Sequence, residues 1–408
     1  MVPGSLDRVP RLCYPLPLSN NVDRATAMKT SKTHIDTFTE GLRAGLEARD
    51  DQGLLRRLEP GEGVDFASND YLGLARDPHL LAAMRTYLEG GDAGAPASRL
   101  LRGNHPEHVS AEEDFARFKG TEAALFFSSG FQANVGMLSG LIGRHDRVLT
   151  DRLNHASIID GLRMTRADRV VFPHLDLTHL ENKLREPHER GQTFVVVESL
   201  FSMDGDIAPL DRIAELCEQH DALLIVDEAH ATGVFGENGS GLVEHFGVSD
   251  QALATTATCG KALGLAGAFV CASQTVVDHL VNHARSFIYS TAPIPVLAHG
   301  IRKAIEFIEG NPEPRARLMD VSKRIRTTLS KAGIAVLMED SPVLSVRLSD
   351  RHEALEVSDR LREQGFDVRA LRPPTVPVGT SRLRISLHAQ HTDDEIDSLA
   401  RALIELVA

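Results

Sequence analysis

Between about Phe66 and Phe269, short runs of apolar residues alternate with stretches in which apolar residues recur every three or four positions. The short runs have the length and composition of buried strands, whereas the recurring spacing is typical of amphipathic helices. This alternation predicts an α/β fold with a mostly parallel central sheet and helices on both faces. The predicted strands are Ala123 to Phe127, Val148 to Thr150, Arg169 to Phe172, Phe194 to Val197, Ala222 to Val226 and Ala268 to Cys271.

The pattern changes on either side of this region. The stretch before Asn21 is rich in Pro, Ser and Asn and predicts a loose tail, and residues 33–57 have helical spacing that breaks near Gly53. We therefore predict a tail and helical arm over 1–65, a large domain over 66–295 and a small α+β domain over 296–408. The small domain has predicted strands at Val343 to Leu348, Phe366 to Leu371 and Leu383 to Leu387, a helix from Glu353 to Gln364, and a last helix that opens on the capping box Thr392-Asp393-Asp394-Glu395.

Composition excludes several classes of protein. The 408 residues carry a net charge of −13, which disfavours nucleic acid or an anionic membrane as partner. No apolar run approaches the roughly 18 residues of a membrane span, and the first residues lack a signal-peptide core. Four scattered cysteines without metal-ligand spacing predict free thiols and no metal site. We expect a protein of the cytoplasm.

Two separate motifs suggest pyridoxal phosphate chemistry. Lys261 is flanked by small residues in Thr258-Cys259-Gly260-Lys261-Ala262-Leu263-Gly264, so its amine can approach a cofactor aldehyde and hold it as a Schiff base. Asp227 closes the predicted strand 222–226, where its carboxylate can keep a pyridine nitrogen protonated. A Gly-Lys pair is more often a surface turn, and an aspartate after a strand is more often a helix cap. The order of the two motifs along one chain favours the cofactor interpretation.

Further residues could complete such a site. Gly130 and Phe131 open a helix after a strand and can present backbone N–H groups to a phosphate, to which Thr258 offers a hydroxyl. His155 follows a strand and could stack on a planar ring, and His230 lies three residues after Asp227, near enough to hydrogen-bond the ring's phenolic oxygen or a substrate carbonyl.

Two arginines are candidates for gripping an amino-acid carboxylate. Arg382 and Arg384 have the same parity on a predicted strand, so the sequence does not choose between them. We expect the other one to be a solvated charge at a strand edge.

Taken together, the motifs resemble the α-oxoamine synthases, a family of fold type I pyridoxal-phosphate enzymes related to aspartate aminotransferase. The resemblance runs from about Phe66 to the C-terminus. It is carried by an ordered set of motifs: Ser68-Asn69-Asp70-Tyr71-Leu72-Gly73, Ser98-Arg99-Leu100, Ser128-Ser129-Gly130-Phe131, Asn154-His155-Ala156-Ser157, Phe201-Ser202-Met203-Asp204-Gly205-Asp206, Asp227-Glu228-Ala229-His230 and Thr258 to Gly264.

The resemblance implies a role for each matching residue. Lys261 would bind the cofactor covalently and act as a proton shuttle, with Asp227, His155 and His230 as the other catalytic residues. The implied cofactor contacts are Gly130, Phe131, His155, Ser202, Asp227, His230, Thr258 and Lys261, together with Ser290 and Thr291, which would reach the phosphate of a neighbouring subunit in an obligate homodimer with shared active sites. The implied substrate contacts are Asn69, His155 and Arg384, with Thr375 and Arg56 as candidates on the acyl side.

Within the family, the segment Arg372-Pro373-Pro374-Thr375-Val376-Pro377 resembles the members that condense L-alanine with a pimeloyl thioester to give 8-amino-7-oxononanoate, carbon dioxide and a free thiol carrier, in biotin biosynthesis. Whether the carrier is coenzyme A or an acyl carrier protein stays open. Residues 153–161 are shared with the glycine C-acetyltransferases, which gives an alternative reaction. A catalytically inactive, dimerising family member is the third alternative, against which the presence of Lys261, Asp227, His155 and His230 argues.

Overall fold

The computed structural model describes residues 27–373 and 375–407, which fall into two compact units, one up to Glu59 and one from Pro60 onward. In the first unit, helix α1 (Ala27–Asp51) ends just before Gly53, whose φ of 63° is a left-handed conformation that glycine adopts readily. The predicted helix that breaks near Gly53 is confirmed, whereas the arm over 1–65 stays a prediction. The predicted loose tail lies outside the described residues.

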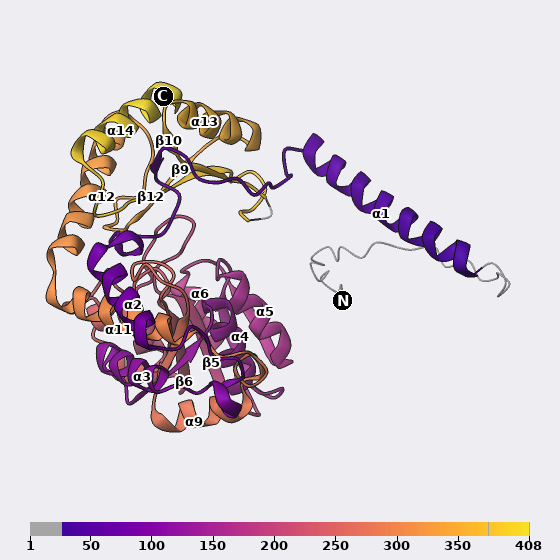
Figure 1. The fold of residues 1–408 in the computed structure, drawn as a ribbon, viewed down its shortest axis with the longest axis vertical. Helices are drawn as coiled ribbons and strands as arrows, with labels where there is room; N and C mark the ends of the chain where they lie inside the picture. Colours follow the sequence, from indigo (N-terminus) through magenta and orange to yellow (C-terminus); the bar gives the residue numbers. More distant parts are fainter. Residues whose placement is uncertain (1–26, 374, 408) are drawn as a thin grey trace. The chain divides into compact units, whose positions relative to one another are not determined.

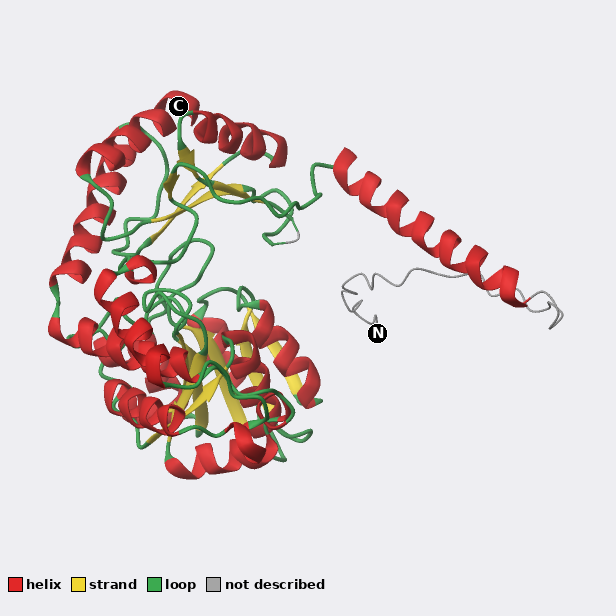
Figure 2. Ribbon diagram, in the orientation of Figure 1, coloured by secondary structure: helices red, strands yellow, loops and turns green. Residues whose placement is uncertain are grey.

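In the described part of the second unit, seven strands form one sheet in the order β2-β8-β7-β6-β5-β3-β4 (Figures 1 and 2). Neighbouring strands are parallel except at β8, which runs antiparallel to both β2 and β7. The predicted mostly parallel sheet is therefore confirmed, although the sequence analysis missed β7. The strands are β2 (Ala123–Phe127), β3 (Arg147–Asp151), β4 (Asp168–Phe172), β5 (Thr193–Glu198), β6 (Ala222–Asp227), β7 (Ala252–Thr258) and β8 (Ala268–Ala272).

Helices cover both faces of this sheet because successive strand side chains point into two different buried layers. Phe127 and Val196 pack in the layer that contains α4, α5 and α9, whereas Phe126 and Val197 pack in the layer that contains α3, α7 and α11. The helices are α2 (Pro78–Gly90), α3 (Pro106–Lys119), α4 (Gly130–Leu141), α5 (Ala156–Thr165), α6 (Leu177–Leu184), α7 (Leu210–Gln219), α8 (Leu242–His245), α9 (Gln274–His283), α10 (Arg285–Ile288), α11 (Pro295–Gly310) and α12 (Glu313–Lys331), with short helical turns at Leu74–Arg76, Arg99–Gly103 and Ser249–Gln251.

A smaller antiparallel sheet follows, in the order β11-β12-β9. The predicted strand over 366–371 is two strands, because β10 pairs with β1 whereas β11 pairs with β12. The predicted capping box is confirmed, since Glu395 N donates to Thr392 Oγ1 at 3.2 Å and Thr392 N donates to Glu395 Oε2 at 2.8 Å. The elements are β1 (Val64–Asp65), β9 (Val343–Arg347), β10 (Phe366–Asp367), β11 (Arg369–Leu371), β12 (Arg382–Ser386), α13 (Arg351–Glu363) and α14 (Asp393–Val407).

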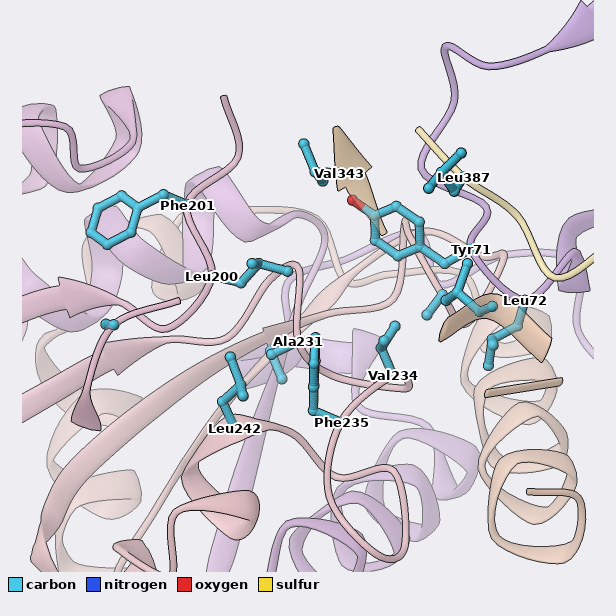
Figure 3. Close-up of a cluster of buried hydrophobic side chains, with 14 of the residues drawn as sticks. Tyr71, Leu72, Leu200, Phe201, Ala231, Val234, Phe235, Leu242, Val343 and Leu387 are labelled. Carbon is cyan, nitrogen blue, oxygen red and sulfur yellow. The ribbon is translucent and has the colours of Figure 1, made fainter. Parts of the chain in front are cut away.

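A buried apolar cluster joins the segment after β1 to the loops at the end of the large sheet (Figure 3). Burying one large apolar side chain contributes about 1.5–3 kcal/mol, so such a cluster holds these segments firmly. The labelled members are Tyr71, Leu72, Leu200, Phe201, Ala231, Val234, Phe235, Leu242, Val343 and Leu387.

The predicted domain boundaries at 65/66 and 295/296 stay predictions. Within residues 27–373 and 375–407, the chain forms no helix of the length and apolarity that a bilayer crossing requires. The cytoplasmic location also stays a prediction.

Candidate active site

The carboxyl ends of β5, β6 and β7 meet at a cavity of about 540 Å³. Their last residues, Glu198, Asp227 and Thr258, all line it. Ligands of open α/β sheets bind at this edge, because the loops that follow adjacent parallel strands converge there. The cavity brings together most of the residues predicted from the sequence: Asn69, Gly130, Phe131, His155, Ser202, Asp227, His230, Thr258, Lys261 and Arg384.

Lys261 lies in the turn after β7, and its Nζ is 3.4 Å from Thr258 Oγ1. The turn is tightly packed, because a Cβ on Gly264, at φ +68°, would lie 2.3 Å from the backbone nitrogen of Ala75. Desolvation lowers the pKa of Lys261, and the nearby carboxyls of Asp227 and Glu198 oppose this shift. A lowered pKa increases the fraction of neutral amine, which is the form that attacks an aldehyde.

Asp227 is buried, and both of its oxygens are oriented by hydrogen bonds. Asn134 Nδ2 donates to Oδ2 at 2.6 Å, and Ala229 N donates to Oδ1 at 2.8 Å. Asn134 Nδ2 also lies 2.9 Å from Ser157 Oγ, which links α4, α5 and the end of β6. A carboxylate held in this way can face a pyridinium nitrogen without rearranging.

Two buried groups that were not predicted from the sequence line the same cavity. Glu198 Oε1 and Asn134 Oδ1 have no hydrogen-bond partner among the residues that the structure describes. Burial raises the pKa of Glu198 well above its usual range, and the charge of Asp227 acts in the same direction. The register of β5 and β6, which pairs Glu198 with Asp227, could have pointed to this residue. Buried polar atoms without partners beside a cavity fit a polar ligand there.

The N-terminus of α4 forms another wall of the cavity. Ser129 caps the helix by accepting from Gln132 N at 3.3 Å, and Ser129, Gly130 and Phe131 line the cavity. The first N–H groups of a helix can bind an anion. A Cβ on Gly130 would lie 2.6 Å from Thr258 Cγ2, so only glycine permits this close approach of helix and strand end. The wall therefore fits the phosphate of pyridoxal phosphate, with Lys261 and Asp227 suited to its aldehyde and its ring nitrogen.

His155 and Ser202 come from two further loops. His155 is the N-cap of α5; its Nδ1 lies 2.7 Å from Ser157 Oγ, and the side chain is exposed at the cavity. That placement leaves the imidazole accessible for stacking on a planar ring. Ser202 is buried, and its carbonyl oxygen accepts from Arg384 Nε at 2.6 Å.

His230 is buried and joined to Tyr71, which the sequence analysis did not single out. Tyr71 Oη lies 2.6 Å from His230 Nδ1 and 3.2 Å from Asn69 Oδ1. Burial lowers the pKa of His230 well below its usual range, with the charges of Lys261 and Arg384 adding to the effect. Burial also raises the pKa of Tyr71 to about 12, so its hydroxyl stays protonated. His230 is therefore neutral at physiological pH, and Tyr71 fixes the orientation of its ring.

The two candidate arginines have different environments. Arg384 lines the cavity, and its Nη2 donates to Asn69 Oδ1 at 2.9 Å. Arg382 does not line the cavity; it forms an ion pair with Asp204, and its Nε donates to Thr380 O at 2.9 Å. The expectation that one arginine is a solvated edge charge is wrong, because both are buried and β12 lies between β9 and β11.

Four predicted residues lie elsewhere. Ser290 and Thr291 line a separate small cavity. Ser290 Oγ accepts from Gln132 Nε2 at 3.3 Å, and Thr291 forms an isolated antiparallel β-bridge with Ser98. Thr375 lies in the loop between β11 and β12 and does not line the cavity of Lys261. Arg56 belongs to the first compact unit. Their roles stay predictions.

Comparison with known proteins identifies the class. The profile of the aminotransferase class I and II family matches residues 61–403. The 8-amino-7-oxononanoate synthase 2 of Bacillus subtilis is 42% identical, over 88% of this chain and 92% of that protein. A solved variant of the S. paucimobilis serine palmitoyltransferase, with a bound PLP-myriocin aldimine, superimposes with a TM-score of 0.84 at 29% identity, over 91% of this chain and 97% of that one. The 8-amino-7-oxononanoate synthase of Francisella tularensis gives a TM-score of 0.74 at 30% identity, over 85% and 98%.

The chain therefore belongs to the aminotransferase class I and II family, with the fold of the type I pyridoxal-phosphate enzymes. Within that family it is an α-oxoamine synthase, and it is similar over most of its length to 8-amino-7-oxononanoate synthases. It is an acyltransferase that depends on pyridoxal phosphate, as its sequence motifs predict.

Proposed function

We propose that this enzyme condenses L-alanine with a pimeloyl thioester to give 8-amino-7-oxononanoate, carbon dioxide and the free thiol carrier. The observation that supports it most directly is the convergence of Lys261, Asp227, His155, His230 and Arg384 on one cavity. The similarity to relatives named 8-amino-7-oxononanoate synthase over most of the chain supports the choice of product.

The proposed reaction uses the residues of the cavity in sequence. Arg384 and Asn69 bind the alanine carboxylate and orient the amino acid. Bound pyridoxal phosphate supplies an electron sink that acidifies the alanine Cα–H bond. Lys261 Nζ takes that proton, and the Cα electron pair forms a bond to the thioester carbonyl carbon while the carrier leaves as a thiolate and takes up a proton.

The second half of the reaction removes carbon dioxide. The bond between Cα and the alanine carboxyl carbon breaks, and carbon dioxide leaves. The bonding electrons stay on Cα, to which Lys261 then returns a proton. In this proposal His230 donates a hydrogen bond to the ketone oxygen, which its contact with Tyr71 supports by holding the ring in place. The buried setting of this pair keeps His230 neutral, so it acts as a hydrogen-bond donor and not as a cation.

We further propose that two chains form a homodimer in which Ser290 and Thr291 of one subunit complete the phosphate site of the other. Their location in a cavity separate from Lys261 supports this arrangement. A Lys261→Ala variant mixed and refolded with a Thr291→Val variant should regain about one quarter of the wild-type activity, because half of the dimers then contain one intact site. Absence of any gain over the two separate variants would contradict shared sites.

The substrate proposal is tested by measuring thiol release from purified holoenzyme with paired substrates. The enzyme should release thiol from L-alanine with pimeloyl-CoA or a pimeloyl carrier protein. The rates with the two carriers are compared directly. Residues 153–161 resemble those of glycine C-acetyltransferases, so glycine with acetyl-CoA is the matched alternative. Turnover with that pair alone would overturn the proposed substrates, and no turnover with any pair, in a protein that binds the cofactor, would favour an inactive family member.

A further inference from the structure

A histidine outside the cavity connects two of the loops that supply its walls. His174 follows β4, and its Nδ1 lies 2.9 Å from Asp151 Oδ1, at the end of β3. Its Nε2 forms a second hydrogen bond with Asp206 Oδ2. We call Asp151, His174 and Asp206 the His174 bridge. Nothing in the sequence analysis singled out His174 or Asp151.

The bonding pattern defines the charge of His174. An ionised carboxylate only accepts hydrogen bonds, so a ring that bonds one carboxylate with each nitrogen must donate from both. His174 in this geometry is an imidazolium, and the two bonds are charge-assisted. The edge-to-face contact with Phe201, at 4.5 Å between centroids, fixes the ring plane.

Asp151 connects the bridge to the loop of His155. Its Oδ1 also accepts from Leu153 N at 2.8 Å, and its Oδ2 accepts from Leu175 N at 2.9 Å. Leu175 has a φ of 51°, a left-handed conformation that a branched residue adopts only when its surroundings enforce it. The backbone beside His174 is therefore strained, and Asp151 accepts from the strained residue.

Asp206 connects the bridge to the loop of Ser202. Residues 201–206 form a closed turn, because Phe201 N donates to Asp206 O at 3.0 Å and Gly205 N donates to Phe201 O at 3.0 Å. A Cβ on Gly205 would lie 2.2 Å from Val343 O, so the turn packs directly against β9. A shift of Asp206 would therefore be transmitted to Ser202, whose carbonyl holds Arg384.

We propose that His174 is a positioning residue for the cofactor site: by joining Asp151 to Asp206 it sets the relative position of the loops that present His155 and Ser202 to the cavity. Such fixing matters because small displacements of binding groups weaken a preorganised site strongly. The proposal depends on the binding of pyridoxal phosphate, which the family establishes, and not on the identity of the acyl substrate.

Charged groups around the bridge make its strength depend on pH. Its two carboxylates raise the pKa of His174 to about 9, against desolvation, which is the largest single influence and lowers it. Glu339, in the segment before β9, accepts from Ile207 N at 2.6 Å, and its carboxyl interacts electrostatically with Asp206, Arg326 and His174. The two hydrogen bonds of the His174 bridge should persist below pH 9 and weaken as the pH rises and the imidazolium loses its proton.

The test is the affinity of the apoprotein for pyridoxal phosphate, measured by equilibrium dialysis from pH 7 to 10. His174→Gln should raise Kd at least about tenfold at pH 7, and the ratio to wild type should shrink above pH 9, where wild type loses the same contact. His179→Gln, at a half-buried histidine on α6, is the matched control and should leave Kd within about twofold. A His174→Gln variant that melts at a lower temperature but binds the cofactor like wild type would overturn the proposal.

A second variant covers the case in which His174→Gln does not fold. Asp206→Asn keeps the side-chain shape and one hydrogen-bond acceptor but removes one negative charge, so it should weaken cofactor binding. In this variant the affinity should begin to fall at a pH about one unit lower than in wild type. ¹⁵N-histidine labelling of the apoprotein gives an independent measurement, since His174 should show two protonated ring nitrogens at pH 7. A neutral ring, or an unchanged pH dependence in Asp206→Asn, would contradict the bridge. Normal cofactor binding without condensation would instead argue against the proposed substrates alone.

Discussion

The two sides of the cavity are built in different ways. On one side, Asp227 and Thr258 are the last residues of adjacent strands, so the backbone of the sheet places them. On the other side, Asn69, Tyr71 and Arg384 come from segments up to 315 residues apart and are joined through side chains. Removing a neighbouring side chain should therefore displace the strand-end residues little. Removing a single hydrogen bond on the second side should disturb the geometry of that side.

The largest effect is expected on the strand-end side, at Lys261. Lys261→Ala removes the amine that binds the cofactor and moves the substrate proton, so kcat should fall at least about a thousandfold and the absorbance band of the lysine-bound cofactor should disappear. Lys303→Ala, at a half-buried lysine on α11 that pairs with Glu306, is the matched control and should change neither. Retention of the band in Lys261→Ala would contradict the proposed role.

The next largest effect distinguishes Arg384 from Arg382. Arg384→Ala should raise KM for L-alanine at least about tenfold, since a charge-assisted grip on the carboxylate is lost. Arg382→Ala should leave this KM within about twofold but lower the free energy of unfolding by about 1–3 kcal/mol, because Asp204 loses one of its partners and keeps Ser345. Steady-state kinetics with alanine and urea unfolding measure the two effects. Equal changes in KM would mean that the carboxylate site extends to both arginines.

A smaller effect is expected at Tyr71, which touches His230 but carries no charge. Tyr71→Phe removes the hydroxyl 2.6 Å from His230 Nδ1, so the ring loses its fixed orientation and kcat should fall about tenfold. KM for alanine should change less than in Arg384→Ala, because Asn69 loses the Tyr71 hydroxyl but keeps its hydrogen bond from Arg384. Tyr87→Phe on α2, outside the cavity, serves as control. An unchanged kcat would show that His230 needs no orienting partner.

The same contrast explains which parts of the site the sequence could predict. Asp227 and Lys261 each lie in a local motif at or just after the end of a strand, and parallel strands bring such ends together. Both the residue pattern and the family resemblance therefore predicted these two residues. The pairing of Arg382 with Asp204 depends on segments 178 residues apart in the chain, and no local pattern encodes it. The contact of Tyr71 with His230 spans 159 residues and was missed for the same reason.

The composition of β7 explains why this strand was not predicted from the sequence. Its sequence, Ala252 to Thr258, is made of alanine, threonine and one leucine, and so lacks the large apolar side chains by which buried strands are recognised. β7 lies between β6 and β8, and its Ala254 and Ala257 are buried in the two layers on opposite faces of the sheet, so small residues suffice there. The strand is therefore specified by its neighbours more than by its own residues.

The smallest expected effect concerns stability and separates the His174 bridge from both sides of the cavity. The folded pKa of His174, about 9, lies above the ordinary value of 6.5, so its stabilisation is complete below about pH 6.5 and is lost as the pH rises through 9. The apoprotein should therefore melt about 2–4 °C above His174→Gln at pH 6, and this difference should approach zero at pH 10. Thermal unfolding followed by circular dichroism measures both. A difference that stays constant over this range would mean that the imidazole packs against Phe201 without carrying charge, and the loops of His155 and Ser202 would then be held by the sheet alone.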